Sequence, residues 1–372
     1  LHPEDRRQRQ MCIRDSNFSG KTCSNKQQPF SVNSFNLLIL SSLLIKIIEY
    51  IIHIMERDKR GYWKPVDKIQ YQPIFQWPLN FKKIFGYFFN LPGFFWPWNT
   101  FYFLLAFITW YVFSPELIKC INFELSWMSL VFFRNLGILI AIAGILHLRL
   151  FIFRSQGERY QYNSNKLDES GKQWMFNKQT RDNIFWSCIS GCTVWSAYEI
   201  VFLWAYANNY LPYLDFYQNP IWFCLWFVVI LFWREFHFYL THRILHFKPL
   251  YKYVHYLHHK NVKVGPWSGL SMHPFEHVIY FSVVLIHLVV PSHPLHFIFN
   301  LQHTALSPIQ GHSGYDQIEL TNKTKVPHSS FFHYLHHKNF ECNYGESTIP
   351  LDKWFGTFYD GSEESYKKVF KK

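Results

Sequence analysis

Apolar stretches close to the ~20 residues needed to cross a bilayer recur along this chain and limit the folds open to it. Lys46 and Glu49 lie inside the first stretch, which therefore either spans the membrane or lies in its interface. Arg134 interrupts the third, and Pro291 and Pro294 break the last into a helical hairpin or two short spans. We predict an all-α integral membrane protein with several transmembrane helices. The stretches are residues 33–55, 98–113, 127–153, 184–207, 221–240 and 278–302.

The loops between these stretches alternate in basic charge. Two of them hold seven and six Lys and Arg residues, whereas the loops that alternate with them hold one and none. Because basic loops stay on the cytoplasmic side of a membrane, this alternation puts residues 241–277 in the cytoplasm, and the proline-broken hairpin returns the chain to that side. We therefore expect a cytoplasmic cap. The basic loops are 57–83 and 154–181, and the others are 114–126 and 208–220.

Composition excludes several other classes of protein. The formal net charge is +12, yet the basic residues lie between apolar stretches and no nucleic-acid-binding motif is present, so we expect no nucleic-acid partner. The 7 cysteines are scattered and odd in number, which indicates neither a disulfide framework nor a zinc ribbon. Aromatic residues make up 21% of the chain, a richness that suits lipid-facing and interfacial surface.

Histidines with metal-ligand spacing crowd the last third of the chain, since seventeen of the 20 lie at or after His237. Three groups have helical spacing, which projects their rings from one face of a helix. Neutral imidazole is a good ligand for iron, zinc and copper. Eight rings are too many for one tetrahedral zinc and suit two metals with four or five ligands each. The groups are His242 and His246; His255, His258 and His259; and His333, His336 and His337.

The residues around these groups argue against a soluble di-iron protein. Such proteins use Glu and Glu-x-x-His pairs on a four-helix bundle, and the sequence contains no Glu-x-x-His pair. An all-histidine set instead favours a membrane-bound metal protein. Isolated histidines are interpreted as hydrogen-bonded interfacial residues, namely His53, His147, His287, His293 and His296.

Six motifs follow one another between Trp233 and Phe358: HRILH at His242, HYLHH at His255, HPFE at His273, GHSGYD at His312, HYLHH at His333 and DKWFGT at Asp352. In this order they resemble the fatty acid hydroxylase/sterol desaturase superfamily, over roughly a third of the chain. Many members carry an Asp seven residues before the first ligand, where this chain has Glu235. HPFE and GHSGYD together favour the sterol-type branch.

The resemblance implies a di-iron centre, with zinc as a substitute in purified protein, that uses O2 to hydroxylate or desaturate a lipid. It implies electrons from a cytochrome b5-type donor fed by NAD(P)H. The expected location is the endoplasmic reticulum in a eukaryote or the inner membrane in a bacterium. His273 is expected either to bind metal or to support another ligand through Glu276. The implied metal ligands are His242, His246, His255, His258, His259, His273, His312, His333, His336 and His337.

The same reasoning divides the chain into four parts. Residues 1–32 are expected to be a disordered tail, of which 1–16 resemble translated library sequence. Residues 33–220 form the N-terminal transmembrane and connecting region, 221–360 the catalytic domain, and 361–372 a basic tail.

Three other functions remain open. They are a fatty acyl or alkylglycerol hydroxylase of the same family, a divalent-metal transporter or store, and an inactive family member. The histidines sit at the ends of the apolar stretches rather than at their centres, which argues against transport. A lipid would enter sideways past aromatic residues, for which the candidates are Trp233, Phe236, Phe238, Tyr239 and Trp267.

Overall fold

The computed structural model describes residues 39–45, 47–48, 57–58, 60–65, 69–321 and 324–371. Its contacts divide the chain into two units, residues 1–51 and 52–372. In the first unit, residues 39–45 and 47–48 are helical and expose apolar side chains such as Leu40 and Leu43. The expected tail, 1–32, and most of the expected span at 33–55 lie outside the described residues.

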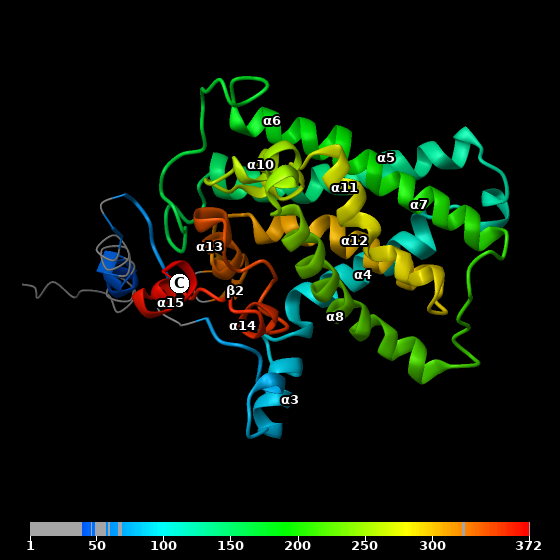
Figure 1. Ribbon diagram of the computed structural model, residues 1–372, viewed down its shortest axis with the longest axis horizontal. Coiled ribbons are helices and arrows are strands. Elements are labelled where there is room, and N and C mark those ends of the chain that lie inside the picture. Colours follow the sequence, from blue (N-terminus) through cyan, green and yellow to red (C-terminus); the bar gives the residue numbers. More distant parts are fainter. Residues whose placement is uncertain are drawn as a thin grey trace, which may run out of the picture. The chain divides into compact units, whose positions relative to one another are not determined.

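The second unit is built from long apolar helices (Figure 1). Helix α12 lies at its centre, because residues 294–306 are all buried and α12 contacts α4, α5, α7 and α8. The long helices are α4 (Thr100–Ile108), α5 (Leu125–His147), α7 (Cys192–Ala207), α8 (Pro220–Leu245) and α12 (Pro294–Gly311), and π-helical turns extend several of them: η3 (Phe95–Asn99), η4 (Thr109–Phe113), η6 (Leu148–Ile152) and η7 (Trp186–Gly191).

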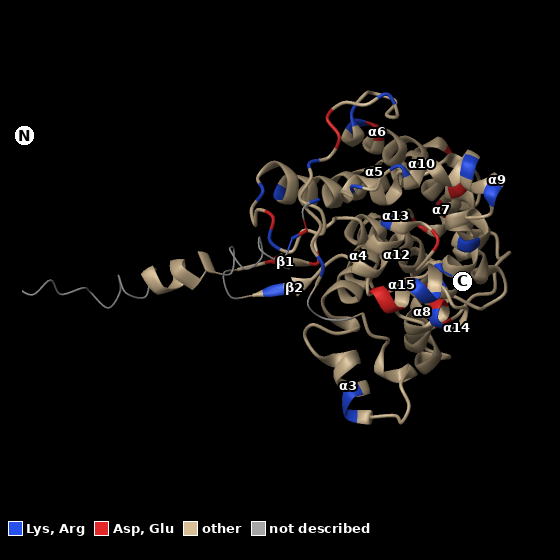
Figure 2. Ribbon diagram, turned by 60° about the vertical axis from the view of Figure 1, so that its left-hand side comes forward, with Lys and Arg blue, Asp and Glu red and all other residues tan. Residues whose placement is uncertain are grey.

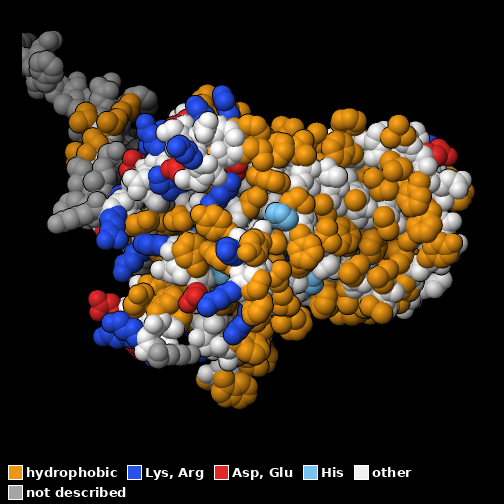
Figure 3. All heavy atoms as spheres, turned by 45° about the horizontal axis from the view of Figure 1, so that its top comes forward, with side chains coloured by type: hydrophobic (Ala, Val, Ile, Leu, Met, Phe, Trp, Pro, Cys, Tyr) orange, Lys and Arg blue, Asp and Glu red, His pale blue; other side chains and the backbone are white. Residues whose placement is uncertain are grey.

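Three of the described helices are long and apolar enough to cross a membrane, at Leu125–Ile152, Gln179–Ala207 and Pro220–Leu245. They correspond to three of the stretches expected from the sequence. Figure 3 shows a broad hydrophobic surface beside an end of the second unit that is rich in Lys and Arg. The prediction of an all-α membrane fold is confirmed.

The remaining two stretches of the second unit also form helices, although neither is a long continuous span. Stretch 98–113 folds into α4 and its flanking π turns, and 278–302 divides between a shorter apolar helix, Pro274–Leu288, and α12. The chain breaks there because Pro294 starts α12 and His293 caps it, accepting the N–H of Leu295 at 3.1 Å.

The basic loop 154–178 lies at the same end of the bundle as the C-terminal helices, and residues 114–124 and 208–219 lie at the other end (Figure 1). Tyr162 of that loop stacks on Tyr334 of α13, with ring centroids 4.9 Å apart. The alternation of basic loops therefore has a matching arrangement in space.

Most of the shorter elements form the cap at that end, while η5 (Leu117–Cys120) lies at the other end. A two-stranded antiparallel ribbon pairs Ile318 with Val326, a small addition to the all-α expectation. The elements are η2 (Pro73–Phe75), α3 (Phe81–Phe89), η5 (Leu117–Cys120), α6 (Gln179–Phe185), α9 (Lys248–Leu250), η8 (Tyr251–His255), α10 (Tyr256–His259), η9 (Pro266–Leu270), α11 (Pro274–Phe281), η10 (Ser282–Leu288), β1 (Gln317–Glu319), β2 (Lys325–Pro327), α13 (Phe331–Asn339), α14 (Leu351–Trp354) and α15 (Glu363–Phe370).

Candidate metal centre

The histidine motifs lie on four helical segments whose ends meet in the cap. The last turn of α8 carries His242 and ends at His246, and His312 follows directly on α12. The two HYLHH motifs occupy η8–α10 and α13. Ser330 starts α13 by accepting the backbone N–H of His333 at 3.3 Å, which fixes where the second motif begins.

These segments bring nine of the ten expected ligands into two compact clusters. In each cluster, one ring nitrogen from every histidine lies within 4.8 Å of those from the others. The five-histidine cluster consists of His242, His246, His255, His259 and His336, and the four-histidine cluster consists of His258, His312, His333 and His337.

Each HYLHH motif contributes to both clusters. His255 and His259, one turn apart, join the five-histidine cluster, while His258 points to the other. The second motif divides the opposite way, with His333 and His337 in the four-histidine cluster and His336 in the five-histidine cluster. Adjacent residues on a helix point about 100° apart, so each neighbouring pair of histidines separates between the two sites. The clusters are therefore tied together by the same two helices.

Hydrogen bonds to the backbone fix which nitrogen of several rings faces inward. The Nδ1–H of His242 donates to the carbonyl of Tyr344 and that of His336 to the carbonyl of Cys342, both at 2.6 Å. The Nδ1–H of His312 donates to Pro308 at 2.8 Å. In a neutral ring the other nitrogen, Nε2, then carries no proton, and its lone pair is directed into the cluster.

These inward lone pairs face one another at close range. Nε2 of His312 lies 2.9 Å from that of His337 and 3.1 Å from that of His333. In the other cluster, Nε2 of His336 lies 3.0 Å from that of His259. Two metal–nitrogen bonds of about 2.0–2.1 Å that meet at about 90–110° place their nitrogen atoms about 2.8–3.4 Å apart. The donor atoms therefore fit one metal ion in each cluster.

Burial keeps the rings neutral and so ready to bind metal. It lowers the pKa of His259 and His337 well below the usual value, and neighbouring histidines add to that effect. Burial also lowers the pKa of His312 to about 4. His246 is the only member of either cluster that is not fully buried.

One ligand has a carboxylate behind it. The Nδ1–H of His255 donates to Glu276 Oε1 at 2.7 Å, and both side chains are buried. The structure does not bring His273 into either cluster, because its Nδ1 accepts the backbone N–H of Phe275 at 3.2 Å and so caps α11. Glu276 thus supports a ligand directly, and His273 supports the helix that carries Glu276.

Two acidic residues hold the loop that orients His242 and His336. Asp352 accepts the backbone N–H groups of Tyr344 and Gly345, both at 2.8 Å. Glu235 accepts the N–H of Glu346 at 2.9 Å. A Cβ on Gly345 would lie 3.2 Å from Asp352 Oδ2, so the loop packs tightly against its support. The DKWFGT motif and the position of Glu235 signalled these residues in the sequence, but not their role.

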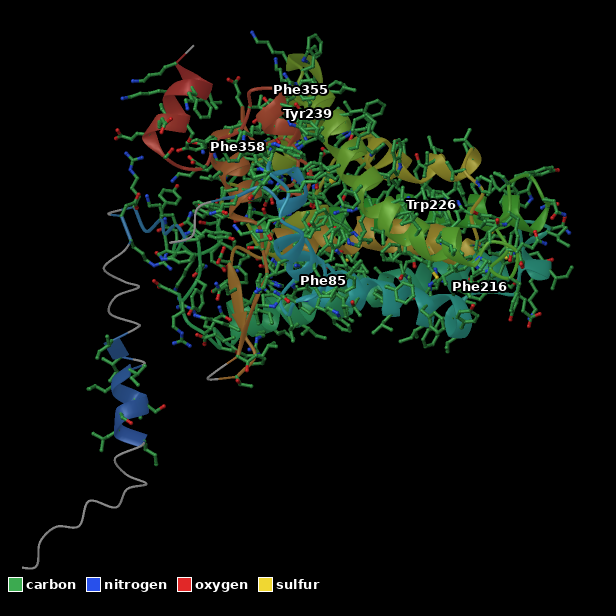
Figure 4. The ribbon with its side chains drawn as sticks, turned by 90° about the horizontal axis from the view of Figure 1, so that it is seen from below. Phe85, Phe216, Trp226, Tyr239, Phe355 and Phe358 are labelled. Carbon is green, nitrogen blue, oxygen red and sulfur yellow. The ribbon has the colours of Figure 1, made fainter. Side chains whose placement is uncertain are left out.

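A cavity of about 360 Å³ opens beside the clusters. His242, His255, His258, His312 and His333 form part of its wall. Of the five aromatic residues expected along a lipid route, Phe238 alone lines it. Tyr239 instead stacks on Phe355, with ring centroids 5.6 Å apart (Figure 4). The cavity gives a substrate direct access to both clusters.

Long apolar helices and paired, all-histidine clusters at their ends define a class of helical membrane proteins. Residues 227–357 match the fatty acid hydroxylase family, in agreement with the superfamily that the order of the histidine motifs resembles. The matched region holds all nine clustered histidines.

Curated relatives agree with this resemblance. The chain is 33% identical over 139 residues to a Delta(7)-sterol-C5(6)-desaturase of Nicotiana tabacum, covering 36% of this chain and 50% of the relative. It is 29% identical over 255 residues to methylsterol monooxygenase 1 of Gallus gallus, covering 66% and 80%. A Delta(7)-sterol 5(6)-desaturase of Gibberella zeae is 32% identical, covering 39% and 38%. The chain thus spans half or less of the two desaturases. No solved structure gives a significant match.

Proposed function

We propose that this chain is a membrane-bound oxygenase that hydroxylates or desaturates a lipid, with a sterol favoured over a fatty acyl group. The observation that carries the proposal is the cavity wall, to which five histidines of the two clusters contribute. The printed functions of the relatives, sterol desaturation and methylsterol oxygenation, support a sterol as the substrate.

The nine clustered histidines would hold two iron ions, one in each cluster, and zinc would occupy the same nitrogens in some preparations. Iron in such a site supplies O2-dependent cleavage of an unactivated C–H bond, with two external electrons and two protons balancing the formation of water. His273 lies outside this ligand set.

The chain's own residues position the ligands and the lipid. Glu276 and the loop at 342–346 hold the rings of His255, His242 and His336 in one orientation. The buried cavity excludes bulk water and aligns one carbon of the substrate with the clusters.

Electrons would come from a cytochrome b5-type donor supplied by NAD(P)H. Figure 2 shows Lys and Arg residues at α9, which lies between the first two histidine motifs. Lys248 and Lys252 of this segment are exposed and offer positive charge to an acidic partner, whereas Lys260 and Lys263 form ion pairs with Asp182 and Asp168. We place this face in the cytoplasm, at the endoplasmic reticulum of a eukaryote or the inner membrane of a bacterium.

Metal analysis and turnover by the purified protein test the proposal. We expect about two iron ions per chain and O2-dependent oxidation of a sterol when a one-electron donor is supplied. His255→Ala should abolish turnover. A stoichiometry of about one metal, or unchanged turnover by His255→Ala, would refute the dinuclear site. Oxidation of a fatty acyl lipid in place of a sterol would identify the alternative branch of the family.

A further inference from the structure

A second, larger hollow adjoins the cavity at the clusters. It has a volume of about 940 Å³ and lies along α4 and α8. Asn99 and Leu231 belong to the walls of both hollows. The larger hollow, here called the apolar groove, therefore lies directly beside the cavity that reaches the histidines.

The apolar groove opens on the outer surface of the bundle. Its wall is mostly aromatic, with Phe103, Phe227 and Phe299 as examples. Tyr111 and Tyr217 at its edge are 62% and 89% exposed. Figure 4 places Phe216, at the far end of the groove, well away from Tyr239 and Phe355 near the clusters. A hydrocarbon from the surrounding lipid can therefore enter from the side.

The wall of the inner cavity carries several polar side chains among its apolar ones. His328 is 5% exposed, and neither ring nitrogen has a hydrogen-bond partner within the described part of the chain. Two hydrogen bonds fix its backbone: the N–H of His328 donates to the carbonyl of Asp316, and its carbonyl accepts from the side-chain amide of Gln310, each at 2.8 Å. Burial lowers the pKa of His328 to about 3, so the neutral ring has one donor and one acceptor to offer.

The charges in this wall favour a neutral ligand. Arg234 forms an ion pair with Glu346 at 3.1 Å, and both residues line the cavity. This pair balances the charge of the guanidinium, while its Nε and Nη1 groups have no hydrogen-bond partner among the described residues and could also donate to an oxygen of the ligand. A hydroxyl group matches the unpaired donor and acceptor of His328.

We propose that the cavity and the apolar groove form one binding site for a lipid with a neutral hydroxyl at one end, in which the hydroxyl enters first and bonds His328. The hydrocarbon body lies in the groove between α4 and α8. This inference rests on the proposed function, and it specifies how the lipid is held. His328 is a positioning residue that selects the hydroxyl end.

The arrangement limits which carbon reacts. Leu231, at the junction of the two hollows, is eleven residues before His242 on α8, or about 16 Å along the helix. His328 and five of the clustered histidines line the same cavity on the inner side of this junction. We therefore expect the oxidised carbon to lie nearer to the hydroxyl end than to the part of the lipid held in the groove.

Chemical protection of Cys224 tests occupancy of the groove without measuring turnover. Cys224 is exposed and lines the groove, whereas Cys188 is half-buried and lies outside it. A sterol added to the wild-type protein in detergent should slow the reaction of Cys224 with N-ethylmaleimide at least fivefold and leave Cys188 unchanged, as followed by mass spectrometry. Equal labelling of Cys224 with and without sterol would overturn the proposed site.

Variants of His328 test the hydroxyl contact. His328→Phe should raise KM for the sterol about tenfold and leave kcat within twofold, whereas His328→Asn, which keeps a donor and an acceptor, should restore most of the loss. For the same sterol without its hydroxyl, KM should be equal for the wild type, His328→Phe and His328→Asn. If His328→Phe raised KM tenfold for both sterols, with and without the hydroxyl, this would contradict the hydroxyl contact.

The two readouts separate this inference from the proposed function. If sterol protects Cys224 but is not oxidised, the proposed oxygenase function fails and the lipid site stands. If sterol is oxidised without protecting Cys224, the function stands and the site proposed here fails.

Discussion

At the scale of single residues, the structure distinguishes groups that face the clusters from groups that support them. Glu276 and His273 belong to one HPFE motif, yet only Glu276 reaches a clustered histidine. Hydrogen bonds behind a metal ligand fix its tautomer and raise its basicity. We therefore expect the carboxylate of Glu276 to contribute to metal affinity through His255.

We predict that Glu276→Gln lowers the metal affinity of the five-histidine cluster about 10–100-fold, because the amide accepts a weaker hydrogen bond from His255 Nδ1–H. Metal retained after dialysis against a graded chelator measures the change. His273→Asn is the matched control, since Asn also caps a helix, and it should retain the full metal content. Loss of one metal in His273→Asn would restore His273 to the ligand set.

At the scale of elements, the loop at 342–346 lies between α13 and α14 and orients His242 of α8 and His336 of α13. Its position depends on Asp352, whose Oδ1 also accepts the hydroxyl of Thr357 at 2.6 Å. Burial raises the pKa of Asp352, and these hydrogen bonds oppose that rise. The loop is therefore a structural support of the proposed metal centre, although it contributes no histidine to either cluster.

We predict that Asp352→Asn destabilises the protein by about 1–3 kcal/mol, because at least one backbone N–H of the loop loses its acceptor, and that it also reduces metal binding by the five-histidine cluster. Thermal unfolding and metal content measure the two effects. Asp360→Asn provides the comparison, since Asp360 accepts the N–H of Ser362 at the start of α15. It should leave metal content unchanged, and equal metal loss in both variants would contradict the assigned role of Asp352.

A second element-scale contact holds α5 to α7. Arg134 of α5 pairs with Glu199 of α7, and Asn135 donates to the same carboxylate at 2.9 Å. Both charged side chains are buried. Arg134, which interrupts an apolar stretch in the sequence, is therefore neutralised within the bundle.

We predict that Arg134→Met destabilises the protein by about 3–5 kcal/mol, because it leaves the Glu199 carboxylate buried without its partner. Adding Glu199→Leu should recover most of this loss, since the uncompensated charge is then gone. Thermal unfolding in detergent compares the single variant, the double variant and the wild type. An unfolding temperature of the single variant equal to that of the wild type would contradict this role of the pair.

At the scale of the whole molecule, the cap concentrates many buried imidazoles at one end of the bundle. Burial lowers the pKa values of His255, His258, His333 and His336 well below the usual one. An unfolded chain binds protons at these positions near pH 6.5, whereas the folded chain does not. The folded state is therefore favoured above that pH.

We predict that the metal-free protein loses stability as the pH falls below about 6.5. Each such histidine contributes about 1.4 kcal/mol per pH unit until its folded pKa is reached, because the unfolded state binds more protons. Melting temperatures at pH 8, 7, 6 and 5 should be level above pH 7 and fall below it. A melting temperature that stays constant down to pH 5 would show that these rings are protonated in the folded state.

The sequence by itself determined the helices, the histidine motifs and the family resemblance, because helical periodicity and motif order are local properties of a chain. Only the tertiary structure decided how the rings divide into clusters of five and four, since that depends on residues such as His259 and His336, 77 positions apart. It also moved His273 out of the set and brought Asp352 and Glu235 behind the ligands. Spacing along a helix sets the direction of a side chain, but packing between helices sets what it meets.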